Sequence, residues 1–220
     1  MITISAFEWA PDFAKGQVRD LRARWALEEA GLPYRARLLA QGDQDKPEYR
    51  ALQPFGQVPI FEEDDLTLFE TGAIVHYIGE RSEALLPKDP AARARATQWL
   101  VAALNSIEPF IMQVALIDLF YKDEEWAKLR RPGAAEFAQK RLAGLSKALG
   151  DKPYLDGDGF TAEGLDLGDD RVGGGGGAAR TVHRAAQVVD HDLGAPARQF
   201  QRVLTTQAAA GPGDDRDFPV

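Results

Sequence analysis

The chain has 220 residues, 45% of them hydrophobic, so it can form one large or two small domains with a real core. Its net charge of −8, from 26 Lys and Arg against 34 Asp and Glu, argues against nonspecific binding to nucleic acid. The absence of cysteine excludes disulfides and thiol redox catalysis, and the lack of an unbroken membrane-length apolar run or a basic-apolar leader predicts a soluble, unexported protein with no membrane contact.

The chain divides at about residues 82–90. Before this segment, strand and helix patterns alternate as in a small α/β unit, and after it the apolar periodicity is helical. We therefore predict a first domain over 1–81, a linker over 82–90 and an all-helical domain over 91–220.

Residues 54–72 predict a strand, a tight turn, a second strand and the start of a helix. Pro59 has no N–H to donate, so it must begin an edge strand or leave the ladder. A cis bond before Pro59 would expose the N–H and C=O of Val58, which could pair with a bound peptide like an added strand. Asp64-Asp65 supplies the turn, and residues 66–69 return with alternating apolar side chains.

A third helix is expected over 73–80, and it opens on Glu70-Thr71-Gly72. The free N–H groups at a helix start attract a carboxylate, and the Thr71 hydroxyl could help to hold one. The alternative is that Glu70 and Thr71 only cap the helix, which is the commonest use of such residues.

Two longer helices are expected after the linker. Apolar residues at steps of three and four predict a helix over 90–121, which Pro109 should kink. A second helix is expected at about 132–149, with Pro132 in its first turn and Gly150 at its C-cap. Together they predict a helical bundle beside the α/β unit.

The stretch 54–72 resembles the signature of glutathione S-transferases: a proline after Val or Ile, a hairpin, then Glu/Gln-Ser/Thr at the start of the third helix. The resemblance extends over about residues 1–160, with 1–7 similar to the first strand, 16–30 to the first helix and 32–34 to the entry of the second strand. Residues 85–87 resemble the passage into the helical domain, and 154–157 with Phe160-Thr161 the entry to its buried sixth helix. The resemblance implies an N-terminal thioredoxin-like domain followed by a C-terminal α-helical bundle. It also implies a cytoplasmic homodimer that uses glutathione as co-substrate and has no tightly bound cofactor.

The resemblance also implies a glutathione site. Gln57 is similar to the family's Lys or Gln that reaches the glycyl carboxylate, and Val58 to the backbone partner of the cysteinyl group. Glu70 would meet the ammonium of the γ-glutamyl group and Thr71 its carboxylate. Gln53 is added only because it is adjacent to this motif. The full set is Gln53, Gln57, Val58, Pro59, Glu70 and Thr71.

In the family, a Tyr, Ser or Cys near the end of the first strand or the start of the first helix stabilises the attacking thiolate. Residues 5–17 contain no Tyr or Cys, and their only hydroxyl is Ser5, which lies earlier than the family's serine. Ser5 is the catalytic candidate, and the alternative is a strand serine bonded to its neighbours. Other candidates are backbone N–H groups near Ala10 and the side chains of Trp9, Lys15 and Gln17.

An apolar pocket for the electrophile would come from the first loop and the kinked helix. The alternative for each of its residues is packing in the core. The candidates are Phe13, Phe110, Met112, Ile117 and Tyr121.

No metal or nucleotide site is predicted. The three histidines, His76, His183 and His191, form no recognised ligand spacing. The glycine run 173–177 lacks the Gly-Lys-Ser/Thr ending of a phosphate loop.

Residues 163–220 depart from the family. A glycine inside a helix costs about 1 kcal/mol relative to alanine, so the run 173–177 should not form a central helix. The segment is a flexible extension, an unusual ordered segment, or a sequence read out of frame after about residue 162, since a shifted frame in a GC-rich gene gives this bias to Gly, Ala, Arg and Asp. We prefer the third hypothesis, with ordinary family-like helices in this part of the protein.

Two functions remain. The first is a detoxification enzyme that adds glutathione to a small hydrophobic electrophile, or runs a related peroxidase, isomerase or dehalogenation reaction. The second is a noncatalytic glutathione-binding or scaffold protein that keeps the clamp, and the lack of Tyr or Cys near the first strand favours it. We favour the enzyme by analogy, because most chains of this architecture are enzymes.

Overall fold

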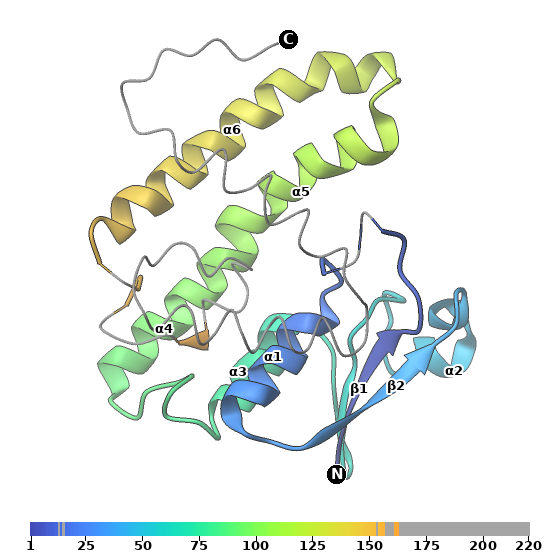
Figure 1. Cartoon of the computed structure of the whole chain (residues 1–220), viewed down its shortest axis with the longest axis vertical. Coiled ribbons are helices and arrows are strands. Elements are labelled where there is room, and N and C mark those ends of the chain that lie inside the picture. The colour runs from blue at the N-terminus through green and yellow to red at the C-terminus, as the bar shows by residue number, and fades with distance from the viewer. Residues whose placement is uncertain (13, 15, 153, 157–160, 163–220) are drawn as a thin grey trace.

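A computed structural model of the chain describes residues 1–162, except 13, 15, 153 and 157–160. The predictions for Phe13, Lys15, Phe160 and the tail 163–220 therefore lie outside the described residues. In the described part, a mixed sheet with helices is followed by a helical region (Figure 1), which confirms the predicted fold class. The long helix of that region begins at Pro90, while the exact division into domains stays a prediction.

The sheet has four strands in the order β2–β1–β3–β4. Strand β1 (Ile2–Phe7) pairs in parallel with β2 (Tyr34–Leu39), and the two are joined through helix α1 (Asp20–Ala30). Strand β3 (Phe61–Glu63) runs antiparallel to β1 and forms a hairpin with β4 (Leu66–Leu68). The predicted hairpin and its Asp64-Asp65 turn are therefore confirmed.

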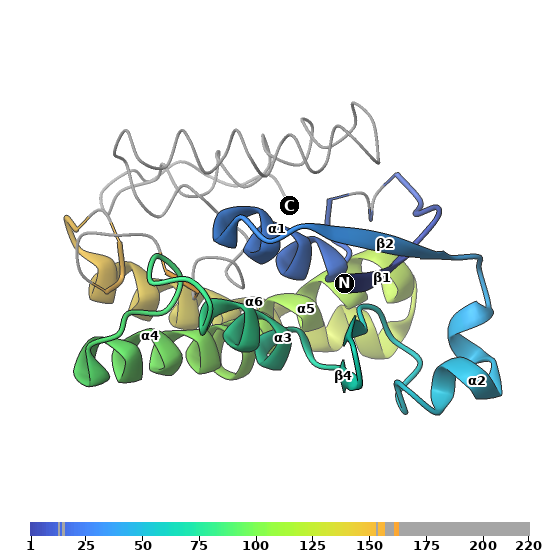
Figure 2. The ribbon, with the colours of Figure 1, turned by 90° about the horizontal axis from the view of Figure 1, so that it is seen from below.

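Helices α1 and α3 (Thr71–Gly79) lie between the sheet and the long helix (Figures 1 and 2). Their apolar sides bury Ile2 and Ile4 of β1, together with Phe61 of β3. A smaller core forms at the other end of β1, around the single-turn helix α2 (Pro47–Arg50) that follows the 3-10 turn η1 (Asp43–Asp45). This second core holds Tyr49 and Val58, so it shapes the segment that leads into β3.

Three predicted element boundaries change in the α/β unit. The peptide bond before Pro59 is cis, as expected, but β3 begins only at Phe61 and lies inside the sheet, so Pro59 leaves the ladder and does not begin an edge strand. Helix α1 starts at Asp20 and not at Gly16, where a φ of 80° interrupts a helical path. Helix α3 starts at Thr71, directly after Glu70.

The long helix runs from Pro90 to Tyr121 through four consecutive pieces. These are α4 (Pro90–Ala102), the π-helical turn η2 (Ala103–Ile107), α5 (Glu108–Leu116) and the π-helical turn η3 (Ile117–Tyr121). The turn η2 ends two residues before Pro109, which has no N–H for the regular ladder, so the helix is irregular at the predicted place, as a widened turn. The predicted kink itself stays a prediction.

Helix α6 (Glu125–Leu149) returns alongside α5 (Figure 1). The predicted start at residue 132 is wrong, because Pro132 lies inside the helix and not in its first turn. Ala127 at the true first turn is completely buried against Ile117 and Ala134, and this contact extends the helix past the proline. Gly150 ends the helix with a φ of 57°, as predicted for the C-cap.

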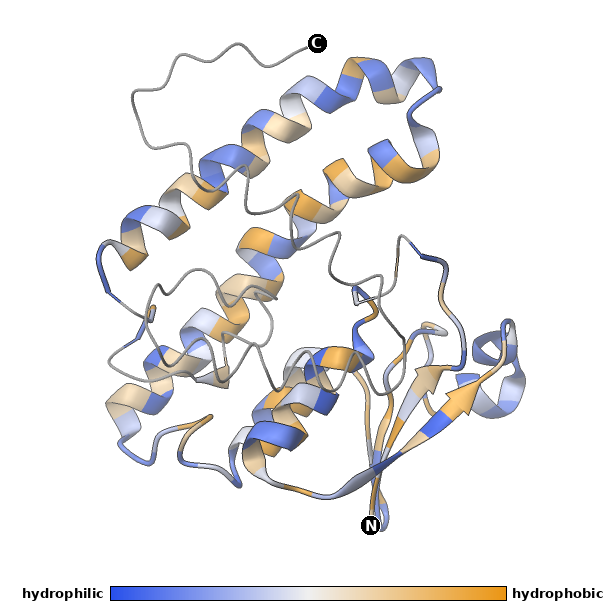
Figure 3. Ribbon diagram, in the orientation of Figure 1, coloured by the Kyte–Doolittle hydropathy of each residue, from blue (hydrophilic) through white to orange (hydrophobic). Residues whose placement is uncertain are grey.

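Residues 90–121 form a helix that is long and apolar enough, by length and composition, to cross a membrane. The helix has 32 residues, and its most apolar window has a mean hydropathy of 1.7 with only 17% of it buried. It is not an unbroken apolar run, and a single helix of this kind is weak evidence for a membrane protein. Figure 3 shows this apolar character along α5, where much of the apolar surface faces outward in the single chain.

Candidate functional site

The segment around Val58 offers unused backbone groups. Val58 itself is buried among Leu39, Tyr49 and Ile60, so its side chain anchors the segment to the second core. In the part of the chain that the structure describes, neither the N–H nor the C=O of Val58 has a hydrogen-bond partner. The backbone of a bound peptide could therefore pair with Val58 in the manner of an added strand.

Glu70 and Thr71 stand at the start of α3. Glu70 occupies the N-cap position but makes no capping hydrogen bond with its side chain, and its φ of 69° places it in the left-handed region. Among the described residues its exposed carboxylate has no partner, which weakens the alternative that Glu70 is only a cap. Thr71 is buried as the first helical residue, where the first N–H groups of α3 have no acceptor inside the helix.

The two glutamines of the predicted site have different settings. Gln53 is buried, and its side-chain oxygen accepts a 2.6 Å hydrogen bond from the Phe55 N–H, so this side chain shapes the turn that it starts. That contact argues against Gln53 as a ligand-binding side chain. Gln57 is exposed and only its carbonyl is engaged by Tyr49, so its side chain is free to reach a ligand.

Ser5 does not have the setting of a thiol donor. Its side chain is 0% exposed in the middle of β1. The hydroxyl oxygen accepts a 2.7 Å hydrogen bond from the Ile60 N–H and lies 2.9 Å from the Tyr49 hydroxyl. The structure therefore favours the alternative, a strand serine bonded to its neighbours. The prediction that Ser5 is the catalytic residue is corrected accordingly.

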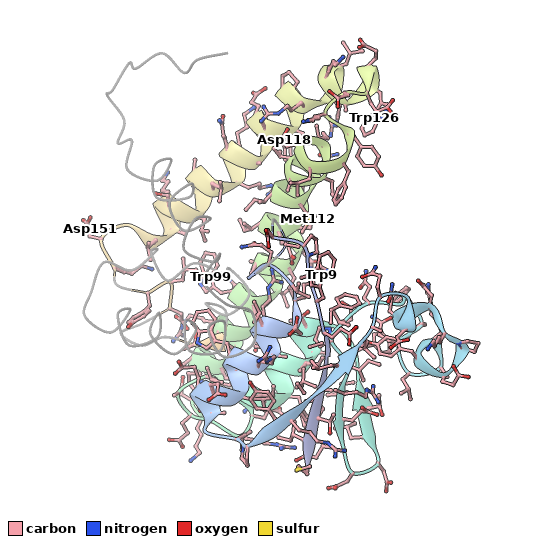
Figure 4. All side chains as sticks on the ribbon, turned by 45° about the vertical axis from the view of Figure 1, so that its right-hand side comes forward. Trp9, Trp99, Met112, Asp118, Trp126 and Asp151 are labelled. Carbon is pink, nitrogen blue, oxygen red and sulfur yellow. The ribbon has the colours of Figure 1, made fainter. Side chains whose placement is uncertain are left out.

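Two further candidates for stabilising a thiolate are present in the described residues. Trp9 lies on the loop after β1 with 62% of its surface exposed (Figure 4), and Gln17 is exposed just before α1. The buried Ala10 lies in the same loop. No described contact distinguishes among them.

A charged cluster that the sequence did not reveal joins α1 to α5. The Arg22 guanidinium donates to the Glu108 carboxylate at 3.0 and 3.1 Å, and Arg19 lies 3.0 Å from the same carboxylate. Burial alone would raise the pKa of Glu108, but the hydrogen bonds and charges of Arg22 and Arg19 outweigh burial and lower it. Glu108 is therefore an anion that holds the start of α1 against the long helix.

The predicted electrophile pocket does not assemble in the described part of the chain. Ile117 is a core residue packed against Ala127 and Ala134, so its assignment to the pocket is wrong. Tyr121 packs on Trp126 with ring centroids 5.2 Å apart, at the end of the helical hairpin far from the sheet (Figure 4).

The other two described candidates lie on α5, where Phe110 packs against α6 and Met112 is exposed. Phe110 contacts the Phe137 ring at a centroid distance of 4.8 Å, and the guanidinium of Arg141 lies over both rings. Met112 is exposed midway along the hairpin (Figure 4). They share one helix, but no described contact joins them.

No group of three or more His, Asp or Glu side chains that could hold a metal ion occurs within the described residues.

Comparisons with known proteins are consistent with this arrangement. The family model "Glutathione S-transferase, N-terminal domain" matches residues 14–80. Glutathione S-transferase F10 of Arabidopsis thaliana is 33% identical over 162 residues, covering 68% of this chain and 72% of the relative. A probable maleylacetoacetate isomerase 2 of Drosophila melanogaster is 32% identical over 114 residues, covering 49% of this chain and 50% of the relative.

Solved structures match as well. A theta class glutathione S-transferase from Xanthomonas axonopodis pv. citri with glutathione bound is 29% identical, with a TM-score of 0.63 over 76% of this chain and 78% of the other. A glutathione transferase family member from Pseudomonas fluorescens with two glutathione bound is 25% identical, with a TM-score of 0.67 over 95% of this chain and 88% of the other.

Proposed function

The chain belongs to the glutathione S-transferase family and is a glutathione transferase, and from this premise we propose that it joins the glutathione thiolate to a small hydrophobic electrophile. The observation that carries the proposal is the pairing of two binding elements. One is the Val58 backbone, whose N–H and C=O have no partner in the described residues, and the other is the start of α3 with Glu70 and Thr71.

Each element suits one part of glutathione. The Val58 N–H and C=O would pair with the cysteinyl backbone, and the N–H groups and hydroxyl at Thr71 would hold the γ-glutamyl carboxylate. The unpaired Glu70 carboxylate would meet the ammonium, and the exposed Gln57 side chain the glycyl carboxylate. The thiol would then face the loop after β1, because Val18, near the end of that loop, packs on the core that holds Val58.

A noncatalytic glutathione-binding protein of the same fold is the second candidate. The observation that favours it is the burial of Ser5, since residues 5–17 contain no other side-chain hydroxyl to stabilise a thiolate. A backbone N–H near Ala10 or a side chain such as Gln17 would have to do so in an enzyme.

Glutathione affinity and turnover test the two candidates together. We expect the wild-type protein to bind glutathione in calorimetry and to conjugate a chlorodinitrobenzene-type substrate. Thr71→Ala should weaken glutathione binding about 10-fold, because a buried carboxylate site loses a hydrogen bond worth roughly 1–2 kcal/mol. Thr67→Ala is the matched control, since Thr67 is exposed on β4. Binding without turnover would indicate the second candidate, and no binding by the wild-type protein would overturn both.

We also propose that the protein works as a cytoplasmic homodimer, with the α/β unit of one chain against the helical region of its partner. Exposed apolar side chains occur on both surfaces. On the α/β unit, Phe55 is 61% exposed and forms an edge-on pair with Phe69. On the long helix they are Val101, Ile111, Met112 and Leu116.

The mass in solution tests the dimer. Light scattering should give about twice the 24.1 kDa of one chain. Phe55→Asp should shift the mass toward that of one chain, because a charge would then be buried in the interface. Leu38→Asp, at an equally exposed apolar residue of β2, is the control and should leave the dimer intact. A wild-type monomer at micromolar concentration would contradict the proposal.

A further inference from the structure

Two buried hydroxyl groups span the segment that carries Val58. The Tyr49 hydroxyl donates to the Gln57 carbonyl at 2.7 Å, and the Ile60 N–H donates to the Ser5 hydroxyl oxygen at 2.7 Å. The two hydroxyl oxygens lie 2.9 Å apart. Gln57 and Ile60 lie on either side of Val58 and Pro59, so the hydroxyl pair holds both ends of the glutathione-binding segment.

The direction of each hydrogen bond follows from the groups at the two ends. A backbone N–H can only donate and a carbonyl can only accept. Tyr49 uses its single proton on the Gln57 carbonyl, so the Ser5 hydroxyl must donate to the Tyr49 oxygen and accept from Ile60. The chain of three bonds therefore has one arrangement, in which no hydroxyl proton is left unused.

The bonds that Ser5 makes are buried, the bond from Tyr49 to the Gln57 carbonyl is partly buried, and the hydrogen-bond chain stays intact at neutral pH. Ser5 is completely buried, and Tyr49 is buried among Leu39, Val58 and Ile60. Burial raises the pKa of the Tyr49 hydroxyl above its usual value of 10.0, although the hydrogen bond with Ser5 opposes this, so Tyr49 keeps its proton. A second bond, from the Ser5 N–H to the Ile60 carbonyl at 2.9 Å, fixes the end of the segment to β1.

We propose that Ser5 and Tyr49 are positioning residues of the glutathione site, which hold the backbone of residues 57–60 so that the Val58 N–H and C=O are set in advance for the cysteinyl group. The inference rests on the proposed binding of glutathione at Val58. Without the hydroxyl chain the segment keeps its side-chain anchor, but its backbone gains alternative orientations, and ordering it then costs part of the binding free energy. The two residues touch neither the thiol nor the electrophile.

Tyr49→Phe is the direct test, since it removes both bonds of the hydroxyl and keeps the ring in its core. We expect the Kd and the KM for glutathione to rise about 5- to 10-fold. The kcat at saturating glutathione and the KM for the electrophile should stay within about twofold, because the reacting groups are untouched. Ser5→Ala should have the same effect, and the double variant should be little worse than either single variant, since the chain acts as one unit.

Tyr34→Phe is the matched control. The Tyr34 hydroxyl is also partly buried in the α/β unit and accepts from Arg24 at 3.4 Å, but it lies on β2, away from residues 57–60. Tyr34→Phe should lower the thermal midpoint by a similar amount and leave the KM for glutathione unchanged. A merely structural role for Tyr49 would make the two variants alike in both measurements.

Two results would overturn the inference in different ways. If the wild-type protein binds glutathione and Tyr49→Phe binds it equally well, the positioning role alone is wrong. If the wild-type protein does not bind glutathione, the proposed function fails first and the inference falls with it.

Discussion

Glu70 holds a backbone conformation that is costly for any residue with a Cβ. Its φ of 69° and ψ of 117° lie outside the regions that such residues prefer, at a cost of roughly 1–3 kcal/mol. The residue directly before Thr71 thus carries strain where the site needs the start of α3. Two substitutions separate the backbone strain from the role of the carboxylate. Alanine at position 70 removes the carboxylate but keeps the strain, whereas glycine removes both the carboxylate and the strain.

We expect Glu70→Gly to be more stable than Glu70→Ala by about 1 kcal/mol, since glycine adopts a positive φ without a steric penalty. Both variants should lose glutathione affinity to the same extent, because both lack the carboxylate proposed to meet the ammonium. Urea unfolding and calorimetry measure the two effects. Equal stability of the two variants would show that the backbone at residue 70 is unstrained, and retained affinity would show that the carboxylate does not bind.

Asp20 is a second residue whose environment opposes its usual state. Burial in the first turn of α1 raises its pKa from 3.8 to about 6, although Arg24, at 3.5 Å, lowers it. A folded pKa above the unfolded value means that protonation favours the native state. The stabilisation is complete below about pH 4 and is lost as the pH rises through about 6.

Asp20→Asn should therefore remove one component of the pH dependence of stability. The difference in unfolding free energy between variant and wild type should change by about 3 kcal/mol between pH 4 and pH 7, in favour of the variant at pH 7. Urea titrations at several pH values measure this. Asp65→Asn, in the exposed turn of the hairpin, is the control and should show no such change. A constant difference across the range would contradict the raised pKa.

At the scale of elements, α3 and the long helix approach closely at Gly72. A Cβ placed on Gly72 would lie 2.3 Å from the terminal Cδ1 of Leu104, so only a glycine fits without displacing that side chain. Gly144 in α6 differs, because a Cβ there would meet no atom within 4 Å. Substituting alanine at these two positions therefore separates two effects. At Gly144 only the gain in helix propensity acts, whereas at Gly72 the contact with Leu104 opposes it.

We expect Gly72→Ala to lower the unfolding free energy by about 1–2 kcal/mol, despite the better helix propensity of alanine. In a Leu104→Ala background the same substitution should be stabilising, because the clash is gone. Gly144→Ala should be stabilising by about 1 kcal/mol in both backgrounds. Urea unfolding of the wild type, Gly72→Ala and Gly144→Ala, each with and without Leu104→Ala, measures these effects. The close contact would be refuted if Gly72→Ala had the same effect in both backgrounds.

Elements whose signals are local were predictable from the sequence. The hairpin follows from alternating apolar residues around Asp64-Asp65, and an irregularity in the long helix follows from Pro109, although the sequence predicted a kink and not the π-helical turn that the structure has. The start of α6 was not predictable, because the burial of Ala127 against Ile117 decides it, and Pro132 suited a first turn equally well. The start of α6 is therefore set by a tertiary contact and not by local helix propensity.

The candidate site also has one part that local sequence signals predicted and another that depends on tertiary contacts. Val58, Glu70 and Thr71 were predicted as site residues because they lie in one contiguous motif, and this assignment stays a prediction. The partnership of Ser5 with Tyr49 joins residues 44 positions apart, and no spacing rule pairs them. A lone hydroxyl in the expected strand therefore suggested chemistry, whereas the fold uses it to hold a backbone.

At the scale of the whole molecule, Glu108 joins the α/β unit to the helical region. It sits on α5 between Arg19 and Arg22 of α1, and only 13% of its side chain is exposed. Its pKa is lowered overall, since the two arginines outweigh burial. A lowered pKa stabilises the native state above the unfolded pKa of about 4.5, and this contribution is lost as the pH falls through the folded value.

Glu108→Gln should cost about 1–3 kcal/mol at pH 7, because it leaves half-buried arginines without their carboxylate. The cost should shrink in acid, as the pH falls through the lowered pKa of Glu108 and the wild-type carboxylate also loses its charge. Glu136→Gln is the control, since Glu136 forms a solvent-exposed pair with Lys140, and exposed ion pairs contribute little to stability. Urea unfolding at pH 7 and at pH 3 distinguishes the two. If Glu108→Gln cost no more than the control at pH 7, the cluster would not hold the two parts of the molecule together.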